Sequence, residues 1–304
     1  MELENNFNLE RFNPEVLREY DIRGIVNKDL TVNTAYSIGR TFGHIVCTKF
    51  SEKKIATGYD GRLTSPSLHD ALCAGLLESG ANVFSVGLCP TPMAYFAHYH
   101  LKTDAAVMVT GSHNPPEYNG FKMVLNKHSF FADEIQNLQS LTTLKNISTG
   151  QGKLNNIDIR NEYVKNNLKN IKFNKKMKIA WDIANGSMGT VIDSFTNQLS
   201  SAEHIVINKE VDGTFPNHHP DPTVPKNMEQ LVKTVVSNSC DIGLGFDGDG
   251  DRLGVVDNKG NIIWADQYML LLAKEISNLY ENPKIIMDVK SSKVFFDEVK
   301  KFNC

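Results

Sequence analysis

The sequence predicts an α/β fold in which mixed, mostly parallel sheets are covered by helices. Short apolar runs alternate with helical patterns along the chain, which is typical of parallel sheets joined by crossover helices. Three strand-like runs open on Lys-Ile followed by Ala or Ile, at Lys54, Lys178 and Lys284. Their spacing indicates a domain-sized repeat, and a chain of 304 residues is long enough for roughly two domains.

The first unit has the most complete set of elements. Ser65 is expected to cap a helix that has Pro66 at its first position and ends at Gly80. The other predicted elements of this unit are strands at 54–60, 82–88, 105–109 and 121–125 and a helix at 91–100.

The second unit repeats this order, and the third repeats it in part. A strand from Lys178 turns into a helix and is followed by a strand at 204–209. A strand from Lys284 turns into a helix at 293–302, but too few residues follow Ile262 for a complete domain. The predicted domains are 1–157, 158–261 and 262–304.

Composition argues against several classes of partner. The 32 basic and 35 acidic residues give a net charge of -3, which predicts neither a nucleic-acid partner nor a membrane partner. The five cysteines are odd in number and contain no Cys-x-x-Cys pair, so a reducing compartment is expected. The start "MELENNFNLE" lacks a secretory pattern, and no apolar run reaches about 18 residues. We therefore expect a cytoplasmic protein.

The six residues "DGDGDR" place Asp247, Asp249 and Asp251 two positions apart. They lie between the short strand-like runs 240–246 and 253–257, and the intervening glycines allow a tight turn that gathers the carboxylates. Crowded carboxylates need a counter-charge, and oxygen ligands favour a hard cation such as Mg²⁺. The glycine and glutamate that an EF-hand requires are missing. The alternative is a solvated acidic turn.

The loop "TGSHNP", at 110–115, follows the predicted strand at 105–109. Ser112 is a candidate nucleophile, and a phosphoserine there would offer oxygens to a metal. The glycine pattern of the α/β-hydrolase elbow does not fit. Taken alone, Ser112 and His113 read more readily as turn residues that bond their own backbone, and the functional interpretation depends on the accompanying motifs. Lys122 follows in "GFK" and would serve as an acid or base if its pKa were lowered.

Two further features remain open at this stage. Only seven arginines occur, and three of them, Arg23, Arg62 and Arg252, lie in turns that contain glycine. Arginine grips phosphate in a bidentate manner that lysine does not offer, but the placement of these three residues does not by itself assign them a role. The pair His218 and His219 reads either as metal ligands or, more simply, as part of a loop fixed by prolines.

Taken together, the motifs resemble the α-D-phosphohexomutase family, which includes phosphomannomutases and phosphoglucomutases. "YDIRG" (20–24), "TGSHNP" (110–115), "NGFK" (119–122) and "DGDGDR" (247–252) stand in that family's order and at its approximate spacings, and "DVKSS" (288–292) is similar to its lysine loop. The resemblance implies three-layer α/β/α domains. It also implies that the third domain is incomplete here and that the fourth is absent.

The resemblance also implies roles for individual residues. Ser112 would carry the phosphoryl group, and Asp247, Asp249 and Asp251 would bind Mg²⁺ together with it. The remaining assignments place Arg23 and Lys122 at proton transfer, His113 in support of the loop, and Tyr20, Arg252 and Lys290 facing phosphate or substrate.

The implied reaction interconverts hexose 1-phosphate and hexose 6-phosphate, with mannose or glucose as the sugar. Ser112 would donate its phosphoryl group to give an enzyme-bound hexose 1,6-bisphosphate, such as glucose 1,6-bisphosphate, and would then take back the other one. We expect a phosphosugar partner and a monomer or homodimer.

Two loops of the family have no counterpart in the sequence. These are the sugar-recognition loop Gly-Glu-x-Ser-Gly-His and an arginine- and serine-bearing loop for the distal phosphate. Mannose and glucose are therefore not distinguished. Two alternatives stay open: a catalytically impaired fragment that binds phosphosugar and metal, and a metal-dependent phosphatase acting through phosphoserine.

Overall fold

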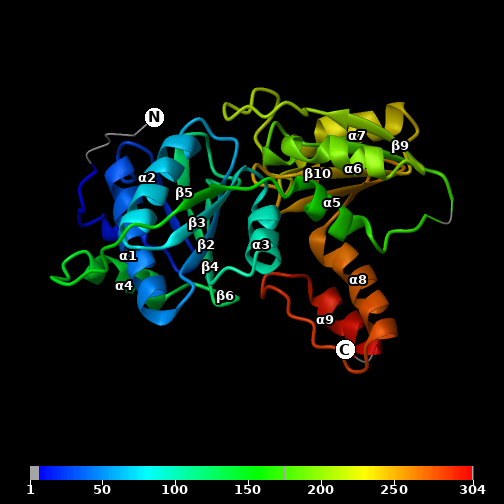
Figure 1. Cartoon of the computed structure of the whole chain (residues 1–304). Coiled ribbons are helices and arrows are strands. Elements are labelled where there is room, and N and C mark those ends of the chain that lie inside the picture. Colours follow the sequence, from blue (N-terminus) through cyan, green and yellow to red (C-terminus); the bar gives the residue numbers. More distant parts are fainter. Residues whose placement is uncertain (1–6, 174, 303) are drawn as a thin grey trace.

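The computed structural model describes residues 7–173, 175–302 and 304. Residues 1–6, where the sequence predicts no secretory signal, lie outside the described residues. Two sheet-based units lie side by side, and a helical C-terminal segment extends from the second unit (Figure 1).

The first unit is built on a mixed sheet, as predicted. Its order is β1-β5-β4-β2-β3-β7, with β6 paired to β5. The pairs among the second, third, fourth and seventh strands are parallel, and the pairs made by the fifth strand are antiparallel. The strands are β1 (Ile22–Ile25), β2 (Lys54–Tyr59), β3 (Asn82–Leu88), β4 (Ala105–Val109), β5 (Tyr118–Leu125), β6 (His128–Ser129) and β7 (Leu154–Asn156).

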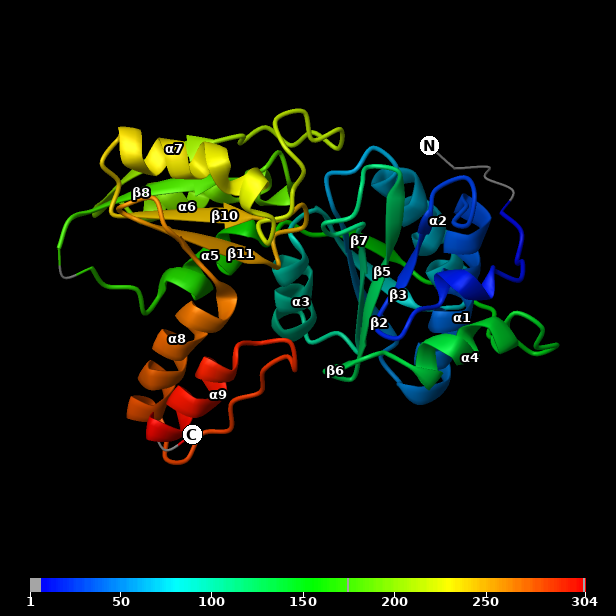
Figure 2. The same cartoon turned by 180° about the vertical axis from the view of Figure 1, so that it is seen from behind.

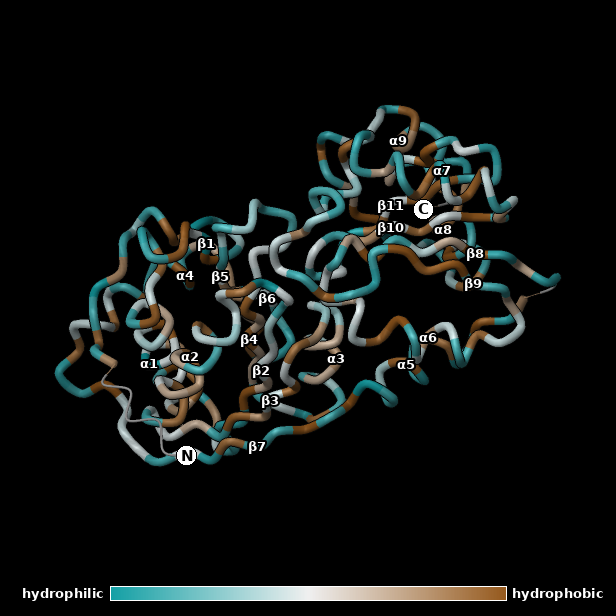
Figure 3. The backbone as a smooth tube through the Cα atoms, turned by 90° about the horizontal axis from the view of Figure 1, so that it is seen from above, coloured by the Kyte–Doolittle hydropathy of each residue, from teal (hydrophilic) through white to brown (hydrophobic). Residues whose placement is uncertain are grey.

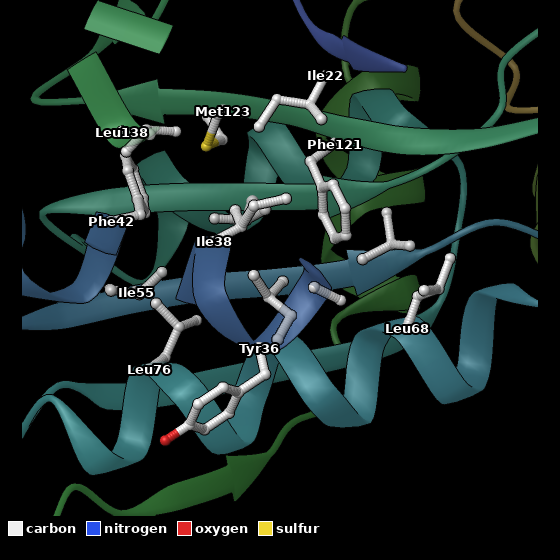
Figure 4. Packing of buried hydrophobic residues seen from close by; sticks show 14 of the residues in the cluster. Ile22, Tyr36, Ile38, Phe42, Ile55, Leu68, Leu76, Phe121, Met123 and Leu138 are labelled. Carbon is white, nitrogen blue, oxygen red and sulfur yellow. The ribbon is translucent and has the colours of Figure 1, made fainter. Parts of the chain in front are cut away.

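Helices cover both faces of this sheet because both faces of its central strands are apolar. In β2, Ile55 packs into the cluster on one face and the next residue, Ala56, packs into the cluster on the other. Figure 4 shows the first of these clusters, which contains Ile55, Phe42 and Phe121. The covering helices are α1 (Val32–Lys49), α2 (Ser65–Glu78) and α4 (Asp133–Leu141) on that face and α3 (Thr91–His100) on the opposite face.

The ends of α2 differ in how well the sequence predicts them. Thr64, rather than Ser65, is the N-cap residue, and Ser65 is the first helical residue. The hydroxyl of Ser65 donates to Asp60 instead, which draws it away from the helix backbone. Gly80 follows the end of the helix at φ 95°, which confirms the predicted stop, since this left-handed conformation favours glycine.

The second unit is built on the sheet β12-β11-β10-β8-β9 (Figure 2). The pairs β10 with β8 and β8 with β9 are parallel, and the other two are antiparallel. The predicted strands on either side of "DGDGDR" form the antiparallel hairpin. The elements are β8 (Met177–Asp182), β9 (Ala202–Ile207), β10 (Ile242–Phe246), β11 (Leu253–Asp257), β12 (Ile262–Ile263), α5 (Arg160–Leu168), α6 (Ile192–Gln198) and α7 (Glu229–Ser237).

One apolar cluster runs from the first unit into the second. It contains residues of α3, such as Met93 and Ala97, together with Tyr163 of α5, Ile192 of α6 and Trp181 of β8. Seen from above, α3 lies between the sheet of the first unit and the helices α5 and α6 (Figure 3). Because buried apolar area is the main stabilising term in folding, this shared cluster holds the two sheets in a fixed relation.

The predicted strand from Lys284 is wrong. The segment is irregular, and the side chains of Ile286 and Val289 are each 91% exposed. In the two equivalent openings, Ala56 and Ala180 are 1% and 0% exposed. A strand needs a neighbour for its backbone hydrogen bonds, and no strand of the described residues pairs with this segment. The helix predicted after it forms and packs on a preceding helix; the two are α8 (Ala265–Leu279) and α9 (Lys293–Val299).

Two findings concern the whole chain. Within the described ranges, none of the helices combines the length and the apolar character needed to cross a membrane. All five cysteines are free thiols.

Candidate active site

The loop that carries Ser112 begins where the buried strand β4 ends. Ser112 is 3% exposed and has a φ of 51°, a left-handed conformation that is uncommon for serine. Its backbone N–H donates to Oγ1 of Thr110 at 2.7 Å, and the N–H of Thr110 donates to the carbonyl of Gly120 on β5. The end of the sheet therefore fixes the start of this loop.

The acidic loop joins β10 to β11 and turns at Gly250, whose φ is 71°. Oδ1 of Asp247 accepts hydrogen bonds from the backbone N–H groups of Asp251 and Arg252, both at 3.0 Å. One oxygen from each of Asp247, Asp249 and Asp251 lies within 4.8 Å of the others. The turn thus gathers the three carboxylates, as the sequence predicts.

The serine loop and the acidic loop come from different units and meet. Oγ of Ser112 donates to Oδ2 of Asp247 at 3.3 Å. A Cβ added at Gly248 would lie 2.7 Å from the backbone oxygen of Ser112, so the glycine permits this approach. The hydroxyl of Thr91 donates to Oδ2 of Asp249 at 2.6 Å, and Oγ1 of Thr110 lies 3.1 Å from the same oxygen.

Lys122, on β5, is the positive partner of the acidic loop. Its Nζ lies 2.7 Å from Oδ2 of Asp249 and 2.5 Å from Oδ2 of Asp251. Burial by itself would lower the pKa of Lys122, but the two carboxylates outweigh it and raise that pKa above its ordinary value. The sequence-based prediction that Lys122 serves as an acid or base requires a lowered pKa, and the shift is in the opposite direction.

The carboxylates themselves differ in their electrostatic surroundings. Burial, followed by the charges of Asp249 and Asp251, raises the pKa of Asp247 well above its usual range. Burial also opposes ionisation of Asp249, but the charge and hydrogen bond of Lys122 prevail and lower its pKa to about 2. A second positive charge near Asp247 would offset the repulsion between its carboxylate and those of Asp249 and Asp251.

The residues fit a hard divalent cation. Three carboxylates from one tight turn offer oxygen ligands only, the donor set that Mg²⁺ takes in proteins. Oδ1 of Asp249 is buried and has no hydrogen-bond partner among the described residues. A buried acceptor without a partner is costly, and a cation at this oxygen would satisfy it.

A cavity of about 300 Å³ opens beside Ser112. Arg23 reaches it from β1, is 4% exposed and is paired with Asp21. Nδ1 of His113 lies 3.3 Å from Oγ of Ser112, and burial followed by the charge of Arg252 lowers the pKa of this imidazole. The lining residues are mostly charged: Arg18, Asp21, Arg23, Ser112, His113, Asn114, Lys122, Asp251 and Arg252.

Four of the predicted site residues lie outside this lining: Asp247 and Asp249, which are fully buried, and Tyr20 and Lys290. The side chain of Tyr20 is 77% exposed. Lys290 lies in the irregular segment before α9, and its side chain is 86% exposed. Contact of either residue with substrate or phosphate stays a prediction. The cavity does bring together Arg23 of β1, Ser112 and His113 of the serine loop, Lys122 of β5, and Asp251 and Arg252 of the acidic loop.

The structure adds residues that sequence reasoning left without a role. Asp60 accepts hydrogen bonds from the Thr110 hydroxyl and the Gly111 N–H, and Arg62 donates to carbonyls of the serine loop. The position of Arg62 in the glycine-flanked turn "DGRL" was the signal that could have identified it. Thr91, at the start of α3, carries no comparable signal in the sequence.

The chain matches two family models in sequence. Residues 14–144 match the model described as phosphoglucomutase/phosphomannomutase, alpha/beta/alpha domain I. Residues 161–260 match the model described as alpha/beta/alpha domain II of the same family. The first match contains the serine loop, and the second contains the acidic loop.

Named relatives and a solved structure agree with these models. A phosphomannomutase/phosphoglucomutase of Pseudomonas putida is 41% identical over 91% of this chain and 60% of its own length. A phosphoglucomutase of Neisseria meningitidis is 41% identical over 94% of this chain and 62% of its own length. The crystal structure of a phosphoglucomutase/phosphomannomutase family protein from Burkholderia thailandensis superposes with a TM-score of 0.90 at 36% identity, covering 96% of this chain and 65% of that one. The chain thus spans 60% and 62% of the length of the two relatives.

Proposed function

Because the chain belongs to the phosphoglucomutase/phosphomannomutase family, we propose that it interconverts hexose 1-phosphates and hexose 6-phosphates, with mannose or glucose as the sugar. The observation that carries the proposal is the meeting of two loops from different units. Oγ of Ser112 lies 3.3 Å from a carboxylate of the acidic loop, and both loops contribute residues to a cavity that is also lined by arginine and lysine.

Phosphoryl transfer would run between Ser112 and the sugar. The bond between phosphorus and Oγ of phosphorylated Ser112 breaks as a hexose hydroxyl oxygen bonds to phosphorus, and the hydroxyl proton passes by way of water to the released Oγ of Ser112. The positive charges of Arg23 and Lys122 favour loss of this proton. The resulting hexose 1,6-bisphosphate turns over and returns its other phosphoryl group to Oγ of Ser112.

Asp247, Asp249 and Asp251 would hold Mg²⁺, together with the phosphate on Ser112. The cation would offset negative charge on the transferring group and on the bridging oxygen. His113 supports the serine loop beside Oγ, and Arg252 supplies a further positive charge in the cavity. Tyr20 and Lys290 are proposed to meet the substrate or its phosphate.

Product analysis tests this proposal. The chain is mixed with a small molar excess of glucose 1,6-bisphosphate in the presence of Mg²⁺, and glucose monophosphate and inorganic phosphate are both measured. We expect at most about one equivalent of glucose monophosphate per chain, formed without inorganic phosphate, because the phosphoryl group stays on Ser112.

The two alternatives give different products in the same assay. A phosphatase acting through phosphoserine would release inorganic phosphate over repeated turnovers. A fragment that only binds phosphosugar and metal would form no product. Parallel reactions with mannose 1-phosphate and glucose 1-phosphate, each with a trace of glucose 1,6-bisphosphate, would show which sugar is converted.

The setting of the protein is also proposed. The five free thiols favour a reducing compartment, and we place the protein in the cytoplasm as a monomer or homodimer. Its partner would be a phosphosugar, with no nucleic acid involved.

A further inference from the structure

The side chain of Arg62 is buried beneath the serine loop. It is 1% exposed, and its terminal nitrogens donate to three backbone carbonyls of that loop and to one at the start of β5. Nη1 donates to the carbonyls of Pro115 and Tyr118 at 2.6 and 3.1 Å. Nη2 donates to the carbonyls of Ser112 and Asn114 at 2.8 and 2.6 Å. A single guanidinium therefore satisfies carbonyls along most of the loop.

Asp60 pairs with the Nε side of the Arg62 guanidinium. Its Oδ2 lies 3.3 Å from Nε of Arg62 and also accepts the Thr110 hydroxyl at 2.8 Å and the Gly111 N–H at 3.0 Å. A Cβ added at Gly111 would lie 2.1 Å from Nε of Arg62, so the guanidinium packs directly against the loop backbone. The carboxylate thus fixes both the arginine and the first residues of the loop.

The second unit covers the guanidinium from the outside. The ring centre of Phe215 lies 5.3 Å from Cζ of Arg62, within range of a cation–π interaction. Phe215 is 8% exposed and has a φ of 51°, a strained conformation for an aromatic residue. A Cβ added at Gly213 would lie 2.7 Å from Cα of Arg62, so the backbones of the two units also touch here.

A buried arginine is expensive unless its charge and all of its donors find partners. Here Nη1 and Nη2 donate to carbonyls of the serine loop and to that of Tyr118 at the start of β5, and Asp60 balances the charge, while Nε makes no hydrogen bond within the described residues. One of these carbonyls belongs to Ser112 in its left-handed conformation. The contacts of Arg62 to Ser112 involve the backbone carbonyl and leave Oγ free to face Asp247.

We propose that Arg62 is a positioning residue for Ser112, a role that rests on the proposed function. Its hydrogen bonds to the loop carbonyls, backed by Asp60 and covered by Phe215, keep Oγ in place beside the acidic loop. Displacement of a reacting atom by about 1 Å can cost about a hundredfold in rate. Loss of the hydrogen bonds from Arg62 to the loop carbonyls therefore slows phosphoryl transfer more than it weakens sugar binding.

The test compares Arg62→Lys and Arg62→Met with the wild-type chain. Phosphorylation of Ser112 by glucose 1,6-bisphosphate and Mg²⁺ is followed over time by intact mass, at a series of bisphosphate concentrations. We expect the maximal rate to fall about tenfold in Arg62→Lys and about a hundredfold in Arg62→Met. The half-saturating bisphosphate concentration should change less than about twofold, because Arg62 does not line the cavity.

Arg40→Lys is the matched control. Arg40 is a second buried arginine of the first unit; it pairs with Glu78 and donates to the carbonyl of Ser148, away from the serine loop. Its replacement should lower the melting temperature and leave the maximal rate within about twofold of wild type. If neither Arg62 variant folds, Phe215→Leu takes their place. It should lower the maximal rate by about two- to fivefold, because it removes only the covering ring.

The outcomes separate this inference from the proposed function. Arg62 variants that melt earlier but transfer phosphate at the wild-type maximal rate would overturn the inference alone. A raised half-saturating bisphosphate concentration at an unchanged maximal rate would also overturn the inference alone. If neither Arg62 variant folds, a Phe215→Leu variant that is as fast as wild type would overturn it. A wild-type chain that takes up no phosphoryl group would overturn the proposed function and this inference with it.

Discussion

Lys122 balances the charge of two carboxylates, Asp249 and Asp251, with one ammonium. In chain treated with EDTA, Lys122→Gln should lose roughly 2–4 kcal/mol of stability, because breaking a buried ion pair leaves a buried charge without a partner. Added Mg²⁺ should then raise the melting temperature of the variant more than that of wild type, since the cation replaces the lost positive charge.

Thermal unfolding with and without Mg²⁺ checks this prediction. Lys54→Gln is the control, because Lys54 pairs with Glu52 near the surface and far less is lost there. Equal shifts with Mg²⁺ in wild type and Lys122→Gln would contradict the assignment of the cation to this acidic loop.

At the scale of residues, the sequence predicts which side chains have suitable chemistry better than it predicts which residues they contact. Crowded carboxylates in "DGDGDR" favour a counter-charge, so local spacing alone predicts a candidate cation site, with a solvated acidic turn as the alternative. The position of Lys122 between Asp249 and Asp251 depends on packing between units. Arg62 is separated from the loop it holds by about 50 residues, and only the tertiary structure shows which carbonyls it meets.

The acidic hairpin must approach the serine loop closely. Gly248→Ala should slow phosphorylation of Ser112 by about tenfold or more, because the added methyl would meet the backbone oxygen of Ser112 at 2.7 Å. Gly245→Ala in β10 is the matched control, since its added Cβ would meet only side-chain atoms of Leu231 and Met228, at 3.2 Å or more. Timed intact-mass measurements compare the rates. Equal rates in the two variants would show that close approach of the loops is unimportant.

Ile55 and Ile286 lie in similar sequence patterns, but only Ile55 is in a buried strand. Ile55→Ala should cost about 2–5 kcal/mol, because Ile55 is fully buried in the sheet of the first unit. Ile286→Ala, in the repeat that opens on Lys284, should stay within about 0.5 kcal/mol of wild type, because that side chain is 91% exposed. Urea unfolding of both variants measures the difference. A large loss in Ile286→Ala would mean that this segment is buried in solution.

At the scale of elements, local pattern predicts strands and helices but not their partners. The openings at Lys54 and Lys178 are buried strands, and the similar opening at Lys284 is irregular. The apolar run is the same kind of signal in all three, but a strand forms only where a neighbour takes its backbone hydrogen bonds. A tertiary contact likewise decides the start of α2. The N-cap residue is Thr64 instead of the predicted Ser65, because the hydroxyl of Ser65 donates to Asp60.

At the scale of the whole molecule, the site exists because two units share a core. The apolar cluster that joins α3 to α5, α6 and β8 fixes the two sheets, and the serine and acidic loops extend from these sheets toward each other. Alternating strands and helices predicted the mixed α/β class, and the repeat predicted more than one unit. The relative placement of the units comes from side-chain packing that no local pattern contains.

The central claim is that Ser112 accepts a phosphoryl group at a site built by both units. Intact mass of the chain after incubation with glucose 1,6-bisphosphate and Mg²⁺ tests it most directly. We expect a gain of about 80 Da in the wild-type chain and none in Ser112→Ala, since a phosphoryl group is the only addition proposed. An unchanged wild-type mass, or the same gain in Ser112→Ala, would contradict it.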